Sequence, residues 1–334
     1  MRRAPSRRQA SLLVALWLST APLSRVRAQD QPLNSGALFL VFPVGARAAG
    51  MGQAAVALDG RGEAAFWNPA GLASMTTSEF GLHAATLVAG RTTTVTAFFP
   101  KAGIGVMGGA AYLVDYGDFP RTDTSGTVIG QISPRNFEFL ASFASELGDA
   151  FLFGLSYKLV QFRADCSGDC RDLPNGQGTS HALDLGGQLA FGSAGALRVG
   201  VAVRNLGFRL QVQNRDQADP LPARLALGAV YRVVLPPLRG ATTAERLDVL
   251  VAADVDSPWG RAGASEMRLG LDLGFGQLVR VRGGYAFVRD GLSGPSVGLG
   301  VTTSAIGVDL ARTFLSGSDL IAENPTFFSF RVTF

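Results

Sequence analysis

Residues 151–160 read FLFGLSYKLV, and a large apolar side chain occupies every second position from Phe151 to Leu159. The positions between them include Gly154, Ser156 and Lys158. A period of two predicts a β-strand with two unlike faces. The same split recurs at 197–204, 224–232 and 268–273. In a soluble sandwich the apolar face would form the core, whereas in a membrane barrel it meets lipid and the other face lines the lumen.

The composition favours the membrane alternative. The chain has 334 residues, of which 47% are hydrophobic and only 17% are charged, whereas soluble domains carry about 25% charged residues. After the N-terminus no apolar run reaches the roughly 18 residues that a transmembrane helix needs. Because unpaired backbone groups are too costly in lipid, a membrane protein without such helices must be a closed barrel.

We therefore predict an all-β protein, an outer-membrane antiparallel barrel of about fourteen strands over residues 79–334. The fourteen expected segments are 79–89, 91–99, 103–115, 136–147, 150–162, 179–191, 197–205, 223–234, 246–256, 265–274, 277–287, 295–301, 304–312 and 326–334. Tight connections alternate with long ones such as 116–135 and 163–178, as in bacterial outer-membrane barrels. The short turn at Gly90 and the long connection 235–245 break this alternation.

The first 28 residues resemble an export signal. A positive segment precedes the apolar run 11–18, and Val26-Arg27-Ala28 predicts cleavage after Ala28. Cleavage would remove six arginines and no acidic residue, which turns the formal charge of +4 negative. The basic character therefore belongs to the targeting segment, and it indicates no nucleic-acid partner.

Residues 44–75 read VGARAAGMGQAAVALDGRGEAAFWNPAGLASM and lack the strand alternation. We predict that the segment 29–78 forms a small hatch inside the barrel, with helical turns whose glycines allow close backbone approach. Asn68 is placed to cap a short helix that begins at Pro69. The alternative is an ordinary N-terminal helix packed on a soluble β-domain.

The chain ends FFSFRVTF, with Phe328, Phe330, Val332 and Phe334 on one strand face. We interpret Phe330 and the terminal Phe334 as a signal for the barrel-assembly machinery. The alternative is a soluble edge strand that ends in Phe by chance. With the export signal, this ending predicts a location in the outer membrane of a diderm bacterium, in contact with its lipid and with both termini periplasmic.

The hatch segment is similar to the N-terminal signature of the PorV/PorQ family, within the wider FadL-like outer-membrane barrels. The matching residues are Gly45, Arg47, Gly50, Gly52, Trp67, Asn68, Pro69, Ala70 and Gly71. The resemblance implies a fourteen-stranded barrel with a hatch in its lumen. It departs at Gln53, where the family often has another glycine, and at 59–62, where paired acids are common.

The resemblance implies two functions. One is a conduit for hydrophobic small molecules, for which we predict an apolar pocket with Phe66 and Trp67 as ligand contacts and a gap in the wall. The alternative is a type IX secretion component that handles cargo proteins. A sealed, purely structural barrel is the third possibility.

No enzymatic activity, cofactor or metal is predicted. Residues 103–108 match G-x-G-x-x-G, but strand alternation continues through Tyr112 where a nucleotide site needs a helix. Neither His83 nor His181 lies near a nucleophile motif. Cys166 and Cys170 predict a local disulfide in an exported loop, because two thiols are too few for a closed zinc site.

Charged residues occupy the predicted lumen face. They include Lys158, Asp184, Arg232, Asp272, Arg280, Arg282 and Arg331. One interpretation is a salt-bridged lining that anchors the hatch. The other is a selectivity path for anionic solutes, which Arg280 and Arg282 favour. The interspersed signs favour the lining, since mixed charges make a poor selective field.

Overall fold

The computed structural model describes residues 35–334 except 149, 171–175, 193–195, 212–217, 236–245, 261–263, 277, 289–292 and 317–323. The predicted export signal lies outside the described residues. Within them, no helix is long and apolar enough to cross a membrane.

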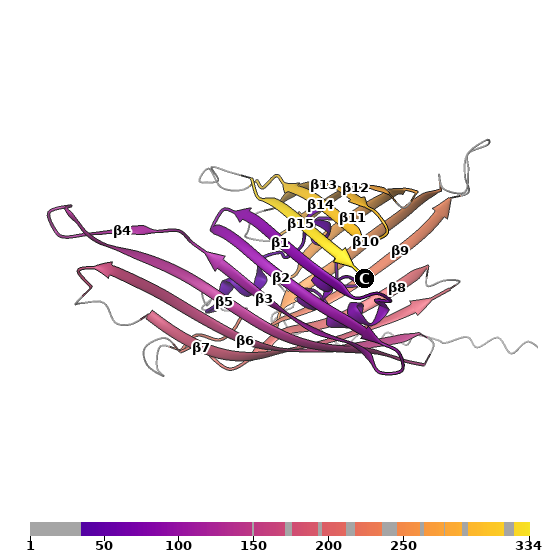
Figure 1. The fold of residues 1–334 in the computed structure, drawn as a ribbon, viewed down its shortest axis with the longest axis horizontal. Coiled ribbons are helices and arrows are strands. Elements are labelled where there is room, and N and C mark those ends of the chain that lie inside the picture. The colour runs from indigo at the N-terminus through magenta and orange to yellow at the C-terminus, as the bar shows by residue number, and fades with distance from the viewer. Residues whose placement is uncertain are drawn as a thin grey trace, which may run out of the picture. The chain divides into compact units, whose positions relative to one another are not determined.

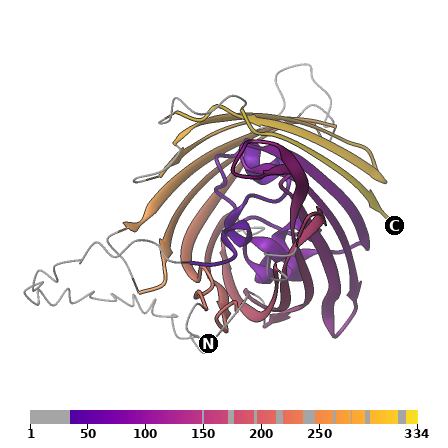
Figure 2. The ribbon, with the colours of Figure 1, turned by 90° about the vertical axis from the view of Figure 1, so that its left-hand side faces the viewer.

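Fourteen antiparallel strands form a closed ring, in which every strand pairs with its neighbours in the chain and β15 pairs with β1 (Figures 1 and 2). The short strand β4 pairs only with β5, so β3 closes directly onto β5. The bounds are β1 Glu79–Leu87, β2 Gly90–Lys101, β3 Gly105–Asp115, β4 Phe119–Thr122, β5 Val128–Leu147, β6 Phe151–Gly168, β7 Gly176–Phe191, β8 Leu197–Gly207, β9 Arg224–Leu235, β10 Leu247–Pro258, β11 Glu266–Phe275, β12 Val279–Phe287, β13 Gly294–Thr302, β14 Ile306–Thr313 and β15 Thr326–Thr333. The predicted fold class and strand number are confirmed.

The two ends of the barrel are distinguished by the chain terminus. Ser78 and Phe334 exchange two backbone hydrogen bonds of 3.1 and 3.0 Å, so the hatch meets the first strand at the rim where the chain ends. We name this the terminal rim. The opposite, distal rim carries the β1–β2 turn and the end of β14 at Thr313.

Several strands run further than the sequence pattern predicts. The expected loop 116–135 instead contains β4 and the first part of β5, and β6 continues through the expected loop to Gly168. These extensions pair residue by residue, for example Gly130 with Gly168. Figure 1 shows β4 to β7 reaching beyond the other strands. The extensions escaped prediction because they lack a regular apolar alternation, and strand pairing above the lipid level needs no continuous apolar face.

The two faces of the wall are inverted relative to a soluble protein. Leu227 and Leu299 point outward and remain 54% and 58% exposed, while Asp184 and Asp272 point inward and are fully buried. A soluble sandwich would bury the leucines, since each fully buried leucine contributes about 1.5–3 kcal/mol. The outward apolar face is therefore explained by lipid.

The hatch lies inside the ring (Figure 2). It consists of the 3-10 helix η1 Leu38–Val41, the α-helix α1 Ala46–Gly50, and the 3-10 helices η2 Gly62–Phe66 and η3 Pro69–Ser74. All four are too short to be stable alone. Their stability comes from the wall that surrounds them.

Candidate functional site

Wall glycines allow the hatch backbone to lie directly on the strands. A Cβ added to Gly270 would lie 2.6 Å from the carbonyl oxygen of Met51, and one added to Gly200 would lie 2.7 Å from that of Val56. The same crowding against hatch atoms occurs on seven of the fourteen strands of the ring. We call the set the glycine belt: Gly154, Gly186, Gly200, Gly228, Gly270, Gly284 and Gly298 on β6, β7, β8, β9, β11, β12 and β13.

Wall side chains also hold the hatch in place, because they accept hydrogen bonds from its backbone N–H groups. Asp254 Oδ2 accepts from the backbone N–H groups of Ala55 and Val56 at 2.6 and 2.9 Å. Ser329 Oγ accepts from Ala46 N at 2.8 Å, and Ser296 Oγ accepts from Gly52 N at 2.9 Å. Buried backbone groups are costly when unpaired, so these contacts hold the hatch at several strands.

The Asn-Pro-Ala-Gly element has a structural explanation. Asn68 is the N-cap of η3, and its side chain accepts from Ala70 N at 3.0 Å while donating to Val56 O at 2.8 Å. Pro69 begins the helix, where its missing N–H costs nothing. Gly71 fits closely, because a Cβ there would lie 3.0 Å from Leu58 O. The motif therefore folds the hatch and joins its two halves.

Phe66 and Trp67, the predicted ligand contacts, are buried in packing instead. Trp67 Nε1 donates to Val44 O at 2.9 Å, and the guanidinium groups of Arg204 and Arg268 lie 5.6 and 5.9 Å from its ring centroid. The ring of Phe66 packs edge-on against Tyr112. Neither residue lines the apolar pocket described below.

Arg47 of the motif begins a charge network toward the terminal rim. Its guanidinium donates to Asp59 Oδ1 at 2.8 Å and to Asp59 O at 3.0 Å, while Arg232 reaches Asp59 Oδ2 at 2.9 Å. Burial alone would raise the pKa of Asp59, but Arg47 and Arg232 outweigh it and hold that pKa well below its usual range. Arg61 bonds Asp309 at 2.9 Å, and burial lowers the pKa of Arg61 to about 10, so this arginine stays charged at neutral pH.

The predicted lumen charges all lie inside the barrel, and they are paired. Lys158 bonds Glu138 and Asp184 at 3.1 and 2.8 Å. Asp272 bonds Arg280 and Arg282 at 3.2 and 2.9 Å. Arg331 donates to Thr302 Oγ1 at 2.7 Å. Such pairing supports the interpretation of a salt-bridged lining rather than an open anionic path.

The predicted wall gap has no counterpart in the strand pairing. All neighbouring strands of the ring are hydrogen-bonded along the described residues. The ladder between β7 and β8 has an irregularity at Leu183–Leu185. There Asp184 accepts from Asn205 N at 2.7 Å, so a bulge replaces regular pairing and the wall stays closed.

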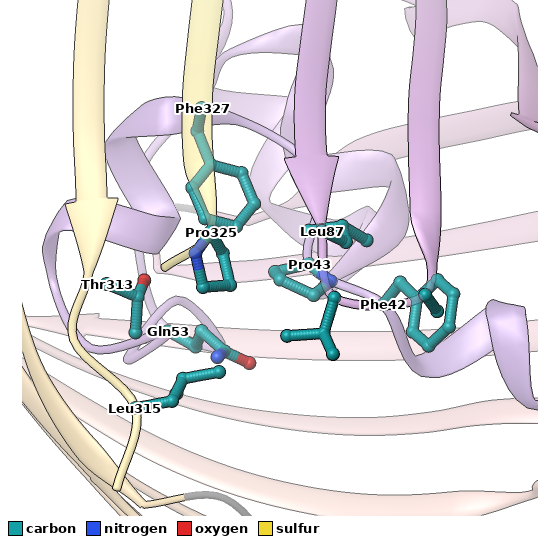
Figure 3. A pocket seen from close by; sticks show the side chains of 10 residues that line it. Phe42, Pro43, Gln53, Leu87, Thr313, Leu315, Pro325 and Phe327 are labelled. Atoms are coloured by element: carbon teal, nitrogen blue, oxygen red, sulfur yellow. The ribbon is translucent and has the colours of Figure 1, made fainter. Parts of the chain in front are cut away.

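An apolar pocket of about 370 Å³ lies between the hatch and the distal rim (Figure 3). Three separate parts of the chain meet there: the hatch, the β1–β2 turn and the strands flanking the β14–β15 connection. The lining residues are Phe42, Pro43, Gln53, Leu87, Val88, Ala89, Thr313, Leu315, Pro325 and Phe327. None of these side chains is charged. Sequence patterns missed the pocket because its members are far apart in the chain and share no motif.

The remaining predicted residues lie away from the pocket. A disulfide joins Cys166 and Cys170 at the end of β6. Phe330 faces outward on β15, and Phe334 packs against Phe99 with ring centroids 6.5 Å apart. Among the described residues, no three His, Cys, Asp or Glu side chains gather at a point where they could hold a metal ion.

The architecture is similar to that of solved transport barrels. The Ralstonia pickettii toluene transporter TbuX aligns over 87% of this chain and 98% of its own, with a TM-score of 0.59 and 13% identity. The Pseudomonas putida toluene transporter TodX aligns over 86% and 96%, with a TM-score of 0.55 and 12% identity. The CymD monoaromatic hydrocarbon channel gives a TM-score of 0.54 at 14% identity, over 87% and 96%.

The chain shares the fold of these transporters. At such low identity the similarity concerns the architecture alone. No protein-family model and no curated protein matches the sequence.

Proposed function

We propose that this protein carries small, neutral, apolar molecules across the outer membrane, and that the pocket at the distal rim is where they bind. The observation that supports this most directly is the uncharged lining of that pocket. In this proposal the terminal rim is periplasmic, so the pocket lies near the end of the barrel that faces the cell exterior. The shared fold with toluene transporters supports the same substrate class.

The size of the pocket favours a compact molecule. Its volume of about 370 Å³ is near the lower end of the ~300–1,000 Å³ usual for ligand pockets. An engineered apolar cavity of ~150 Å³ already binds benzene. A molecule of one or two rings therefore fits, and a long-chain acid would find no cation in the lining to pair with its carboxylate.

The test is a binding titration of the purified barrel in detergent with toluene, using displacement of the fluorescent probe N-phenyl-1-naphthylamine. Val88 lines the pocket and is 50% exposed, so in Val88→Asp a bound apolar molecule would cover an unpaired carboxylate, which is costly. We expect affinity to fall at least tenfold. The matched control is Val128→Asp, at an exposed position on β5, which should bind as the native protein does.

Two results would contradict the proposal. The first is a native barrel that binds neither toluene nor the probe. The second is a Val88→Asp variant that binds both compounds as tightly as the native protein and the Val128→Asp control do. Uptake of radiolabelled toluene by cells with and without the protein then separates binding from transport.

A second function follows from the resemblance to the PorV/PorQ family and from one structural observation. The strands β4 to β7 project well past the distal rim and present Phe119 and Val128 to solvent. In this alternative the projecting sheet handles secreted proteins at the cell surface. An unchanged set of surface proteins in a strain lacking this gene would exclude that role.

A further inference from the structure

Gln53 adopts a backbone conformation that is unusual for its residue type. Its φ is +66°, and Ala37 and Asn205 are the only other non-glycine residues with positive φ among those described. The position follows α1, where its N–H donates to Ala48 O at 2.8 Å and ends the helix. Glycine is the residue that usually adopts a positive φ, as Gly52 directly before it does at +62°, because a Cβ is disfavoured there. A side-chain role would explain why glutamine is present instead.

The side chain of Gln53 lies in the apolar pocket, between Pro43, Thr313 and Leu315 (Figure 3). Among the described residues its amide forms no hydrogen bond. Asn205 provides the contrast, because its amide accepts from Lys158 Nζ at 2.9 Å and donates to Pro222 O at 3.3 Å. Within the described part of the chain, the amide of Gln53 is thus a donor and an acceptor without partners, in a pocket whose other side chains are apolar except for Thr313.

We infer that Gln53 determines specificity in this pocket and selects an apolar molecule that carries one hydrogen-bonding oxygen, such as a phenol, an alcohol or a ketone, over a plain hydrocarbon. This inference rests on the proposed function of the pocket. A primary amide offers two donors and one acceptor oxygen, so it can pair with a hydroxyl in either direction. A site built around such a group discriminates against the analogue that lacks the oxygen, because the amide then loses its partner.

The experiment compares toluene with p-cresol, which differ by one hydroxyl. Dissociation constants are measured by probe displacement for the native barrel and for Gln53→Leu and Gln53→Gly. Both variants remove the amide, but the glycine variant also relieves the backbone conformation. We expect the affinity ratio of p-cresol to toluene to fall about tenfold in both variants, which corresponds to the loss of one hydrogen bond. Gln131→Leu, at an exposed position on β5, is the control and should keep the native ratio.

The outcomes separate the two proposals. An unchanged ratio in both Gln53 variants, with toluene still bound, overturns the role of Gln53 and leaves the proposed transport function standing. A ratio that changes in Gln53→Leu but not in Gln53→Gly would attribute the effect to side-chain bulk and also overturns the inference. A native barrel that binds neither compound overturns both proposals.

Discussion

At the scale of single residues, Glu63 is the hatch carboxylate whose buried charge is least balanced by hydrogen bonds and ion pairs. It is 5% exposed and lies against Gly45, where an added Cβ would overlap its carboxylate. Among the described residues it forms no hydrogen bond and no ion pair. Burial raises its pKa, although the nearby charges of Arg61 and Arg47 oppose the rise.

This predicts a pH dependence of stability. A carboxyl whose pKa is raised on folding stabilises the folded state below its ordinary pKa, and that stability is lost as the pH rises through the folded pKa. Glu63→Gln mimics the protonated form. We expect this variant to have a higher urea midpoint than the native barrel at pH 7.5, and the difference to vanish at pH 4.

The control for this comparison is Glu146→Gln, at an exposed position on β5. It should leave the midpoint unchanged at both pH values. A Glu63→Gln variant that is no more stable than the native protein at pH 7.5 would show that the charged carboxylate is compensated by its surroundings.

At the scale of elements, the glycine belt lets the hatch backbone lie close to the strands of the wall. Two adjacent glycines on β12 allow a matched test of this contact. A Cβ on Gly284 would overlap Gly52 N and Met51 C, whereas a Cβ on Gly283 would meet nothing closer than Ser296 O at 4.0 Å. We expect Gly284→Ala to destabilise the seated hatch by about 1–3 kcal/mol, the usual cost of overpacking. Gly283→Ala should behave as the native protein does.

The measurement is hydrogen exchange of the backbone amides between Ala46 and Val56. Faster exchange in Gly284→Ala, but not in Gly283→Ala, supports close packing of the hatch backbone against the wall. Equal protection in the two variants would mean that the hatch tolerates displacement from the wall.

At the scale of the whole molecule, substitution of Phe334 tests whether the last strand carries a signal for the barrel-assembly machinery. Phe334 is 70% exposed, so its ring contributes little to the folded barrel. We expect Phe334→Ala to lower the amount of protein in the outer membrane severalfold while leaving the urea midpoint of the purified barrel unchanged. Phe208→Ala removes an equally exposed ring, at 76%, and should leave the yield unchanged. Equal yields for both variants would remove the signal role.

The sequence was sufficient for the fold because lipid imposes a regular pattern. Each expected segment overlaps a strand of the ring, since apolar alternation is required wherever a strand crosses the membrane. Above that level the requirement ends, so the pattern did not indicate β4 or the continuation of β6 toward Cys166. Backbone hydrogen bonds between neighbouring strands hold those parts in the sheet, and such bonds leave no mark in the hydrophobic pattern of the sequence.

The candidate site was harder to predict, for a different physical reason. Phe66 and Trp67 stood out because large aromatic residues interrupt a small-residue segment, yet that prominence reflects their packing between Tyr112, Arg204 and Arg268. The pocket is formed by residues that only barrel closure brings together. Gln53 did leave a signal in the sequence, because it departs from the PorV/PorQ signature, which the hatch segment otherwise resembles, where that signature often has glycine.

The close contact between the hatch and the belt also constrains the order of events during biogenesis. Met51, Val56 and Asn68 lie against strands from β7 to β12 with no room for a side chain between them. We therefore expect the hatch to be in place before β15 pairs with β1, so that the sheet closes around the hatch during folding.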